Sequence, residues 1–114
     1  MNEMNRLRAI MLGLSRPGTI LFRNNCGALK DADGRLVRYG VANPGGSDLI
    51  GWRSVIVTAD MVGRKVAVFT AIEVKGERGR PTDAQANFLQ RVRADGGLAG
   101  VARSVEDAMT IVYP

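Results

Sequence analysis

The sequence lacks histidine altogether and contains a single cysteine, Cys26. Without an imidazole, the chain cannot build a Ser-His-Asp or Cys-His catalytic site, a histidine metal triad or a nuclease that uses an imidazole base. One thiol supports neither a disulfide framework nor a four-cysteine zinc site. Any chemistry must therefore depend on carboxylates, lysine, hydroxyl groups and a hard metal ion that prefers oxygen ligands.

Long apolar runs are also missing. No segment approaches the roughly 20 apolar residues of a membrane span. The N-terminal segment does not contain the continuous apolar core of a signal peptide, because Arg6, Arg8 and Gly13 interrupt it. We therefore expect a cytoplasmic protein, with Cys26 as a reduced thiol.

The length of the chain limits the number of domains, and its net charge indicates the class of partner. A chain of 114 residues, 46% of them hydrophobic, is expected to form one ordered domain over residues 1–114. Lysine and arginine number 16 against 11 acidic residues, which gives a net charge of +5. This surplus favours a polyanionic partner, although the charge alone does not identify it.

Apolar periodicity and turn residues predict an α/β fold with the order helix, strands, helix, strand, helix and no internal repeat. The first helix carries one apolar stripe and ends at Pro17-Gly18. A second helix is predicted over residues 82–95, where Thr82 caps it and Gln85 completes a capping-box pattern. Ser104 begins the last helix. The stripe of the first helix consists of Met4, Leu7, Met11 and Leu14.

Strands are predicted between these helices. The dipeptide Asp33-Gly34 predicts the turn of a hairpin. The apolar alternation of residues 66–72 predicts a central strand covered on both faces. Residues 54–58 are expected either to continue the preceding strand or to pair with it. The predicted strands are Thr19–Phe22, the two arms of a hairpin within Gly27–Gly40, Ser47–Trp52, Val66–Ile72 and Leu98–Ala102.

A pair of charged residues follows the predicted central strand. Glu73 and Lys75 are two residues apart, so both side chains lie on one face while Val74 lies on the other. Asp48 follows a glycine-rich loop at the start of another strand. If the two strands are neighbours, Asp48 and Glu73 share one Mg²⁺ or Mn²⁺ ion through oxygen ligands, and the backbone carbonyl of Val74 adds a further ligand.

This combination predicts metal-assisted phosphodiester hydrolysis. A divalent ion lowers the pKa of a water molecule and offsets the charge of the phosphate. Lysine stabilises the developing oxyanion or positions the nucleophile. None of these steps requires histidine. No Gly-Lys-Ser/Thr sequence follows the glycines, which argues against nucleotide hydrolysis of the Walker type.

Five motifs in order resemble the VRR-NUC branch of the PD-(D/E)XK nucleases, and together they cover nearly the whole chain. A lone Glu-x-Lys is common by chance, so the specificity comes from the order of the motifs within one domain-sized chain. The motifs are Phe22-Arg23-Asn24-Asn25-x-Gly27, Gly46-Ser47-Asp48-Leu49-Ile50-Gly51, Ile72-Glu73-Val74-Lys75, Thr82-x-x-Gln85-x-x-Phe88 and Gly96-Gly97-x-Ala99-x-Val101-Ala102-Arg103-Ser104.

The resemblance implies a PD-(D/E)XK-like core, in which helices flank a mixed central β-sheet, and a divalent-metal-dependent endonuclease activity on DNA. Compact stand-alone members are common in phages and prophages, and they resemble homodimeric enzymes that act on four-way (Holliday) junctions. The resemblance also implies that Asp48 and Glu73 bind the metal, that Lys75 is the catalytic lysine and that Gln85 faces the site.

The resemblance also implies that Arg23-Asn24-Asn25 lies near the active site and contacts the DNA. The sequence departs from the family pattern at one position. Family members often carry a further metal-site glutamate on the first helix, where this chain has Met4 or Asn5. Glu3 lies close to that position and is the candidate for the same role.

Each assignment has a structural alternative. Glu73 and Lys75 could form a solvated ion pair of little energetic weight. Asp48 could be a turn residue after Gly45-Gly46, and Gln85 could serve only as the capping-box residue of Thr82. The segment Arg23-Asn24-Asn25 could be a polar exit from a strand.

Basic residues beyond the lysine suggest a contact with nucleic acid. Arg78 and Arg80 flank Gly79 directly after Lys75, so they could clamp phosphates at the mouth of the site. The runner-up function is a non-catalytic nucleic-acid-binding module with a nuclease-like fold, which would bind through phosphate contacts and counterion release.

Overall fold

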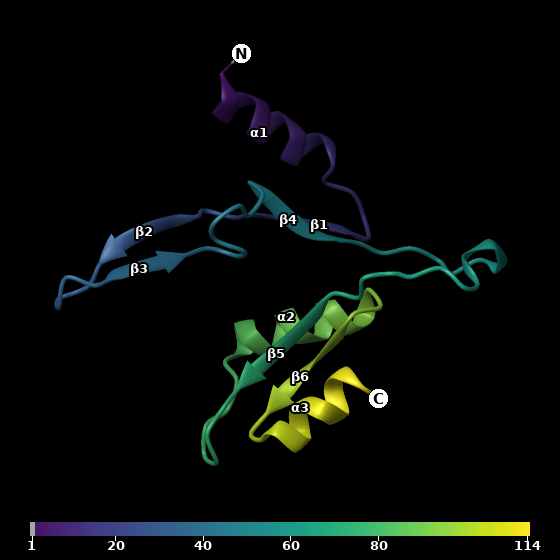
Figure 1. The fold of residues 1–114 in the computed structure, drawn as a ribbon. Helices are drawn as coiled ribbons and strands as arrows, with labels where there is room; N and C mark the ends of the chain where they lie inside the picture. Colours follow the sequence, from purple (N-terminus) through teal and green to yellow (C-terminus); the bar gives the residue numbers. More distant parts are fainter. Residues whose placement is uncertain (1) are drawn as a thin grey trace. The chain divides into compact units, whose positions relative to one another are not determined.

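A computed structural model describes residues 2–114 and confirms an α/β fold with the predicted order of elements (Figure 1). No helix within these residues has the length and apolar character needed to span a membrane. In chain order the elements are α1 (Glu3–Gly13), β1 (Thr19–Arg23), β2 (Gly27–Lys30), β3 (Leu36–Tyr39), β4 (Leu49–Arg53), the short 3-10 helix η1 (Ala59–Met61), β5 (Thr70–Val74), α2 (Asp83–Ala94), β6 (Leu98–Ala102) and α3 (Val105–Val112).

The chain divides into two compact units, one that extends to Arg53 and one that begins at Ser54. The first unit contains α1 and the antiparallel strands β1 to β4. The second contains η1, the parallel strands β5 and β6, and the helices α2 and α3. Whether residues 1–114 fold as one domain stays a prediction.

Antiparallel pairs form the sheets of the first unit. Strand β1 pairs with β4, from Thr19 opposite Arg53 to Arg23 opposite Leu49. Strands β2 and β3 form the predicted hairpin. Gly34 in its turn has a φ of 78°, a conformation that glycine adopts at little cost. The side chain of Asn2 accepts a hydrogen bond from the Asn5 backbone at 2.8 Å and so begins α1.

The second unit is a β-α-β arrangement with one more helix. Strands β5 and β6 run parallel, and α2 connects them (Figure 1). Both α2 and α3 contact β6. Among the described residues, the buried apolar side chains are Leu89 and Val92 of α2 and Ala102 of β6. The small core of this unit therefore lies between α2 and the parallel pair.

Two strand predictions were wrong in extent. Strand β5 begins at Thr70 rather than at Val66, and residues 54–58 form no strand. Val66 and Val68 are exposed, so the apolar alternation of this segment does not reflect burial on two faces. The strands of residues 2–114 form three two-stranded sheets. Both parallel and antiparallel pairing therefore occur, but in separate small sheets rather than in a single central one.

Candidate active site

Glu73 and Lys75 lie side by side on one face at the end of β5. The Lys75 Nζ atom is 3.3 Å from the Glu73 Oε1 atom, and the two side chains are 21% and 28% exposed. The Lys75 backbone N–H donates to the Ala102 carbonyl at 3.1 Å, which continues the parallel ladder one residue beyond the strand. Strand geometry therefore sets the spacing of the pair, as the sequence predicted. Because both side chains are only partly exposed, their interaction is less screened than that of a fully exposed ion pair.

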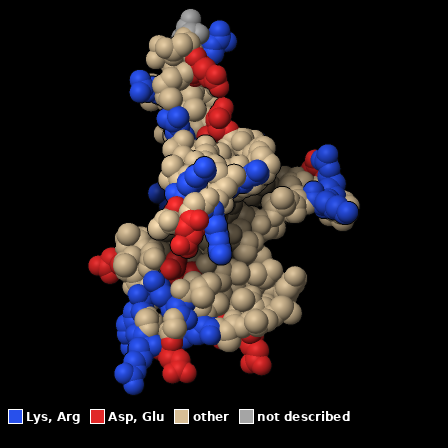
Figure 2. All heavy atoms as spheres, turned by 60° about the vertical axis from the view of Figure 1, so that its left-hand side comes forward, with Lys and Arg blue, Asp and Glu red and all other residues tan. Residues whose placement is uncertain are grey.

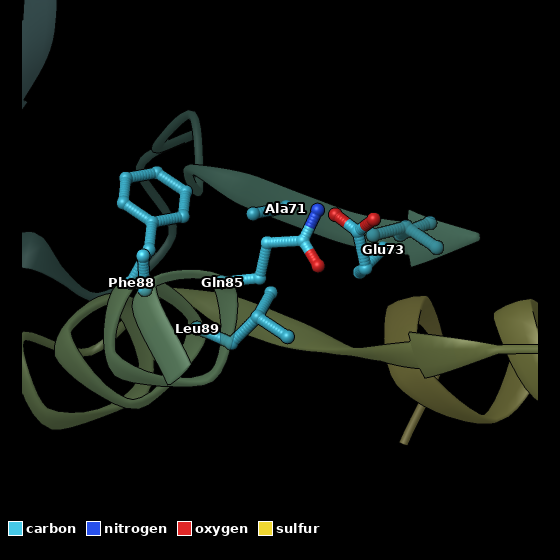
Figure 3. Close-up of a pocket in the computed structure, with 7 residues that line it drawn as sticks. Ala71, Glu73, Gln85, Phe88 and Leu89 are labelled. Atoms are coloured by element: carbon cyan, nitrogen blue, oxygen red, sulfur yellow. The ribbon is translucent and has the colours of Figure 1, made fainter. Parts of the chain in front are cut away.

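A pocket of about 370 Å³, which Glu73 lines, opens between β5 and α2. In Figure 3, the side-chain amide nitrogen of Gln85 points toward the carboxylate of Glu73, while the ring of Phe88 lies farther along the pocket. The pocket thus combines a carboxylate and an amide with an apolar wall. The residues that line it are Ala71, Ile72, Glu73, Ala84, Gln85, Phe88 and Leu89.

Gln85 also has the capping role that was its structural alternative. The Thr82 backbone N–H donates to Gln85 Oε1 at 2.9 Å, and the Gln85 N–H donates to Thr82 Oγ1 at 3.1 Å. These reciprocal bonds complete a capping box. Because the cap uses the amide oxygen, it leaves the amide nitrogen directed toward Glu73 (Figure 3). The two roles are therefore compatible, since the cap orients the side chain within the pocket.

In the first unit, Asp48 lies directly before β4, at the end of a loop held by Asn24. The Asn24 backbone N–H donates to the Asp48 carbonyl at 2.8 Å. The Asn24 side chain donates to the carbonyls of Val41 and Ser47 at 2.9 and 3.1 Å, and its oxygen accepts from the Val41 N–H at 2.8 Å. Gly46 lies so close to Val41 and Asn24 that a Cβ at this position would clash with both. The loop before Asp48 is therefore tightly held.

These contacts bear on the predicted role of Asn24 in binding nucleic acid. Its residue is only 9% exposed, and its amide oxygen and nitrogen bond to the protein backbone. The structure therefore gives Asn24 a positioning role in the loop before Asp48. Asn25 is exposed. The side chain of Arg23 reaches α1, where its Nη1 atom lies 3.6 Å from the sulfur of Met4.

Glu3 is exposed in the first turn of α1. Acidic side chains at this position interact favourably with the helix dipole, which gives Glu3 a structural function independent of any metal. The contact of Arg23 with the neighbouring Met4 nevertheless brings a cationic side chain to this end of α1. Arg23 thus links β1 to the helix end on which the metal-site glutamate of the family was expected.

The turn after Lys75 carries a cluster of cations. Arg78 and Arg80 are exposed on this turn, and Arg103, which follows β6, donates to the Gly79 carbonyl at 2.9 Å. Figure 2 shows a patch in which several Lys and Arg side chains (blue) gather. Sequence reasoning did not assign a role to Arg103. The signal was its position directly after a strand parallel to β5, because the carboxyl ends of parallel strands meet at one edge of a sheet.

Oxygen donors for a divalent ion are present in both units. Glu73 and the Val74 carbonyl lie in the second unit, and Asp48 lies in the first. Within residues 2–114, no three Asp, Glu or Cys side chains form a group that could hold a metal ion. Glu73 lines a pocket and supplies a carboxylate, the type of donor that Mg²⁺ prefers.

The comparisons with known proteins agree with the resemblance of the motifs. The family model for the VRR-NUC domain matches residues 21–106, a span that contains Asp48, Glu73, Lys75 and Gln85. Searches of the curated proteins and of the solved structures return no significant match. The match covers most of the chain and includes parts of both units. The chain therefore belongs to the VRR-NUC domain family of nuclease-like proteins that act on DNA.

Proposed function

We propose that this chain is a divalent-metal-dependent endonuclease that hydrolyses phosphodiester bonds of DNA, with Mg²⁺ or Mn²⁺ as the metal. The observation that carries the proposal is the pairing of Glu73 with Lys75 at 3.3 Å beside a pocket that Gln85 also lines. A solvated strand end would explain the two charges. It would not explain why both side chains are only partly exposed or why the amide of Gln85 faces the same carboxylate (Figure 3).

Glu73 and the carbonyl of Val74 would hold the metal, with Asp48 as a second carboxylate ligand. Asp48 enters the proposal on its sequence motif and on the tight anchoring of the loop before it. Glu3 is an additional candidate, on its place in α1 alone. When bound, a divalent ion offsets phosphate charge and lowers the pKa of water. The metal would thereby activate the attacking water in a chain that contains no histidine to act as a base.

Lys75 would stabilise negative charge on the phosphate. Its ammonium group is held by the Glu73 carboxylate, so little reorganisation is required when a phosphate oxygen approaches. The long side chain is mostly shielded from water, which strengthens its attraction for an anion. Gln85 would restrict the orientation of the Glu73 carboxylate through its amide nitrogen. Lys75, Glu73 and Gln85 would therefore form the catalytic group within the second unit.

Polar and cationic side chains of each unit would hold the DNA. In the second unit, Arg78 and Arg80 follow directly after Lys75, and in the first unit Arg23 and Asn25 lie at the end of β1. Each phosphate that such a side chain neutralises releases counterions, which makes the binding sensitive to salt. We propose branched DNA, such as a four-way junction, as the preferred substrate, on the resemblance to compact members of the family.

We further propose that the enzyme is a homodimer, because two linked sites can cut symmetric strands of a junction. The segment between β4 and β5 supports an association of this kind. Its side chains Ile56, Val57 and Val62 are 87%, 77% and 83% exposed, which is unusual for a run of aliphatic residues. A second copy of this chain is the proposed partner of this segment. A monomeric mass by light scattering, with junction DNA present, would contradict the dimer.

The experiment that tests the proposed function is a cleavage panel. Purified protein is incubated with four-way junction, flap, duplex and single-stranded DNA of the same sequence, with Mg²⁺, with Mn²⁺ or with a chelator. We expect endonucleolytic products from the branched substrates, only with metal. Products in the chelator would contradict metal dependence, and equal cleavage of all four substrates would contradict a preference for branched DNA.

One observation favours the alternative of a binding module without catalysis. Within residues 2–114, side chains do not form a three-carboxylate or cysteine-containing metal group, and the Glu73 carboxylate is satisfied by Lys75. A binding module would retain the salt-dependent affinity for DNA and yield no product in any arm of the panel. Binding alone therefore does not separate the two functions, whereas metal-dependent cleavage does.

A further inference from the structure

Arg103 lies against the turn that follows the candidate catalytic lysine. It comes directly after β6, and β6 pairs with β5 in parallel register up to Val74 opposite Ala102. The hydrogen bond from Lys75 N–H to the Ala102 carbonyl continues this register. Arg103 is thus the neighbour of Lys75 at the shared end of the two strands.

The guanidinium group of Arg103 bonds to the backbone of that turn. Its Nη2 atom donates to the Gly79 carbonyl at 2.9 Å, and its Nη1 atom lies 3.5 Å from the Gly76 carbonyl. These two carbonyls mark the ends of the turn, which is closed by a hydrogen bond from the Gly79 N–H to the Gly76 carbonyl at 3.2 Å. A planar guanidinium can hold two acceptors at once, which a lysine cannot do in the same geometry.

The same turn passes close to the side chain of Lys75. A Cβ atom built on Gly79 would stand 3.5 Å from both Cβ and Cδ of Lys75, which is ordinary van der Waals contact. The turn at Gly79 therefore passes beside the stem of the lysine, with room between them for about one methyl group. On the other side, the Lys75 ammonium meets Glu73 at 3.3 Å. The lysine therefore has the carboxylate at its tip and the turn beside its stem.

We infer that Arg103 is a positioning residue, which fixes the turn of residues 76–79 and through it the side chain of Lys75. The inference rests on the proposed function, because it assigns Lys75 a catalytic role. It differs from a role in DNA contact, in which the guanidinium would serve as a free cation like those of Arg78 and Arg80. Arg103 instead uses its donors on main-chain carbonyls.

The first test needs no nuclease activity. Arg78 is a trypsin site within the turn, whereas the bond after Arg80 resists trypsin because Pro81 follows it. The rate of cleavage after Arg78 therefore reports how firmly the turn is held. We expect the substitution Arg103→Gln to accelerate this cleavage several-fold, and Arg103→Lys to give a smaller acceleration. Cleavage after Arg64 and Lys65, which lie outside the turn, should be unchanged. The matched control is Arg91→Gln on α2, and cleavage of the turn at the wild-type rate in both Arg103 variants would overturn the inference.

The second test separates positioning from DNA contact. A displaced catalytic group can cost on the order of 10- to 100-fold in rate. We therefore expect Arg103→Gln to lower kcat on junction DNA by about that factor, with KM and the salt dependence of binding unchanged. Arg103→Lys should recover only part of kcat. If instead both variants changed KM and the salt slope, or if the lysine restored full activity, Arg103 would be a phosphate contact and the inference would fail.

The two tests fail independently. If the wild-type protein cleaved no DNA, the proposed function would fail. The proteolysis would still test whether the hydrogen bonds of Arg103 hold the turn in place. If Arg103→Gln failed to fold, as judged by its thermal unfolding, the milder Arg103→Lys would carry both measurements. A folded lysine variant with wild-type proteolysis and wild-type kcat would then overturn the positioning role.

Discussion

In the unit from Ser54 onward, regular structure places the candidate catalytic side chains, whereas in the unit up to Arg53 one buried amide holds the loop that ends at Asp48. Glu73 and Lys75 share a face because strand residues alternate, and Gln85 is oriented by the capping box of α2. Asp48 instead follows a loop whose backbone bonds to the side chain of Asn24.

This difference predicts where each part of the site is sensitive to substitution. A strand ladder distributes its support over many backbone bonds, so a side chain of the second unit can be changed with local consequences. The loop of the first unit depends on one side chain, so its loss is expected to affect folding as well as the position of Asp48. Side-chain substitutions in the second unit should therefore change activity, whereas substitution of Asn24 should change stability.

The largest expected effect concerns Lys75. Removal of a group that stabilises developing charge costs about 100- to 1,000-fold in kcat. We expect Lys75→Ala to lower the rate of junction cleavage by a factor in this range, about 100-fold or more. The thermal unfolding of the variant should remain close to that of the wild type. Single-turnover kinetics give the measurement, and Lys30→Ala on the exposed strand β2 is the control. Cleavage by Lys75→Ala at the rate of this control would contradict the catalytic role.

Asn24 should give the largest effect on stability. Its replacement by alanine leaves the Val41 N–H and two carbonyls without their partner, and an unsatisfied buried group costs about 1–3 kcal/mol. We expect Asn24→Ala to lower the free energy of unfolding by about 2–3 kcal/mol in urea titrations. The neighbouring exposed Asn25 is the control, since Asn25→Ala should change stability by less than about 0.5 kcal/mol. Equal stability of the two variants would remove the basis of the comparison.

Gln85 and Thr82 separate capping from catalysis. Loss of an N-cap side chain costs about 1 kcal/mol, so Thr82→Ala should reduce stability by that amount and leave the chemical step nearly intact. Gln85→Ala removes the other half of the capping box together with the amide that faces Glu73 (Figure 3). We expect a similar loss of stability and, in addition, about a 10-fold lower kcat, which is within the range for a group that orients a catalytic residue. Parallel unfolding and kinetic measurements decide, and equal kcat values for the two variants would leave Gln85 with the cap alone.

The smallest expected effect concerns the exposed cations of the turn. Arg80→Gln should weaken binding of all DNA substrates by a similar factor and reduce the slope of log affinity against log salt by about 1, as expected for the loss of one phosphate contact. Fluorescence anisotropy at several salt concentrations gives this slope. Arg91→Gln on the surface of α2 provides the control. An unchanged slope for Arg80→Gln would exclude this residue from the DNA interface.

The residues whose placement follows from local periodicity could be predicted from the sequence. The strand alternation of Glu73 and Lys75, the capping box of Thr82 and Gln85, and the Gly34 turn all depend on neighbours within a few residues. The structural role of Asn24 could not be predicted, because its partners lie 17 and 23 residues away along the chain.

Two further features of the structure differ from what the sequence predicted, because they depend on which strands pair. The alternation at Val66 and Val68 resembles that of a covered strand, but pairing partners decide where a strand begins, and β5 pairs with β6 only from Thr70. The contact of Arg103 with the turn depends on the parallel register of β5 and β6. Neither pairing can be derived from the sequence of a single strand.

The central claim is that the Glu73 carboxylate serves a metal-dependent cleavage of DNA. The most direct measurement compares the wild type with Glu73→Gln on a four-way junction in Mg²⁺, because the amide keeps the size of the side chain and removes the charge that holds a cation. We predict that the variant folds, binds the junction and gives no more product than the wild type does in the chelator. Cleavage by Glu73→Gln at the wild-type rate would contradict the proposed site.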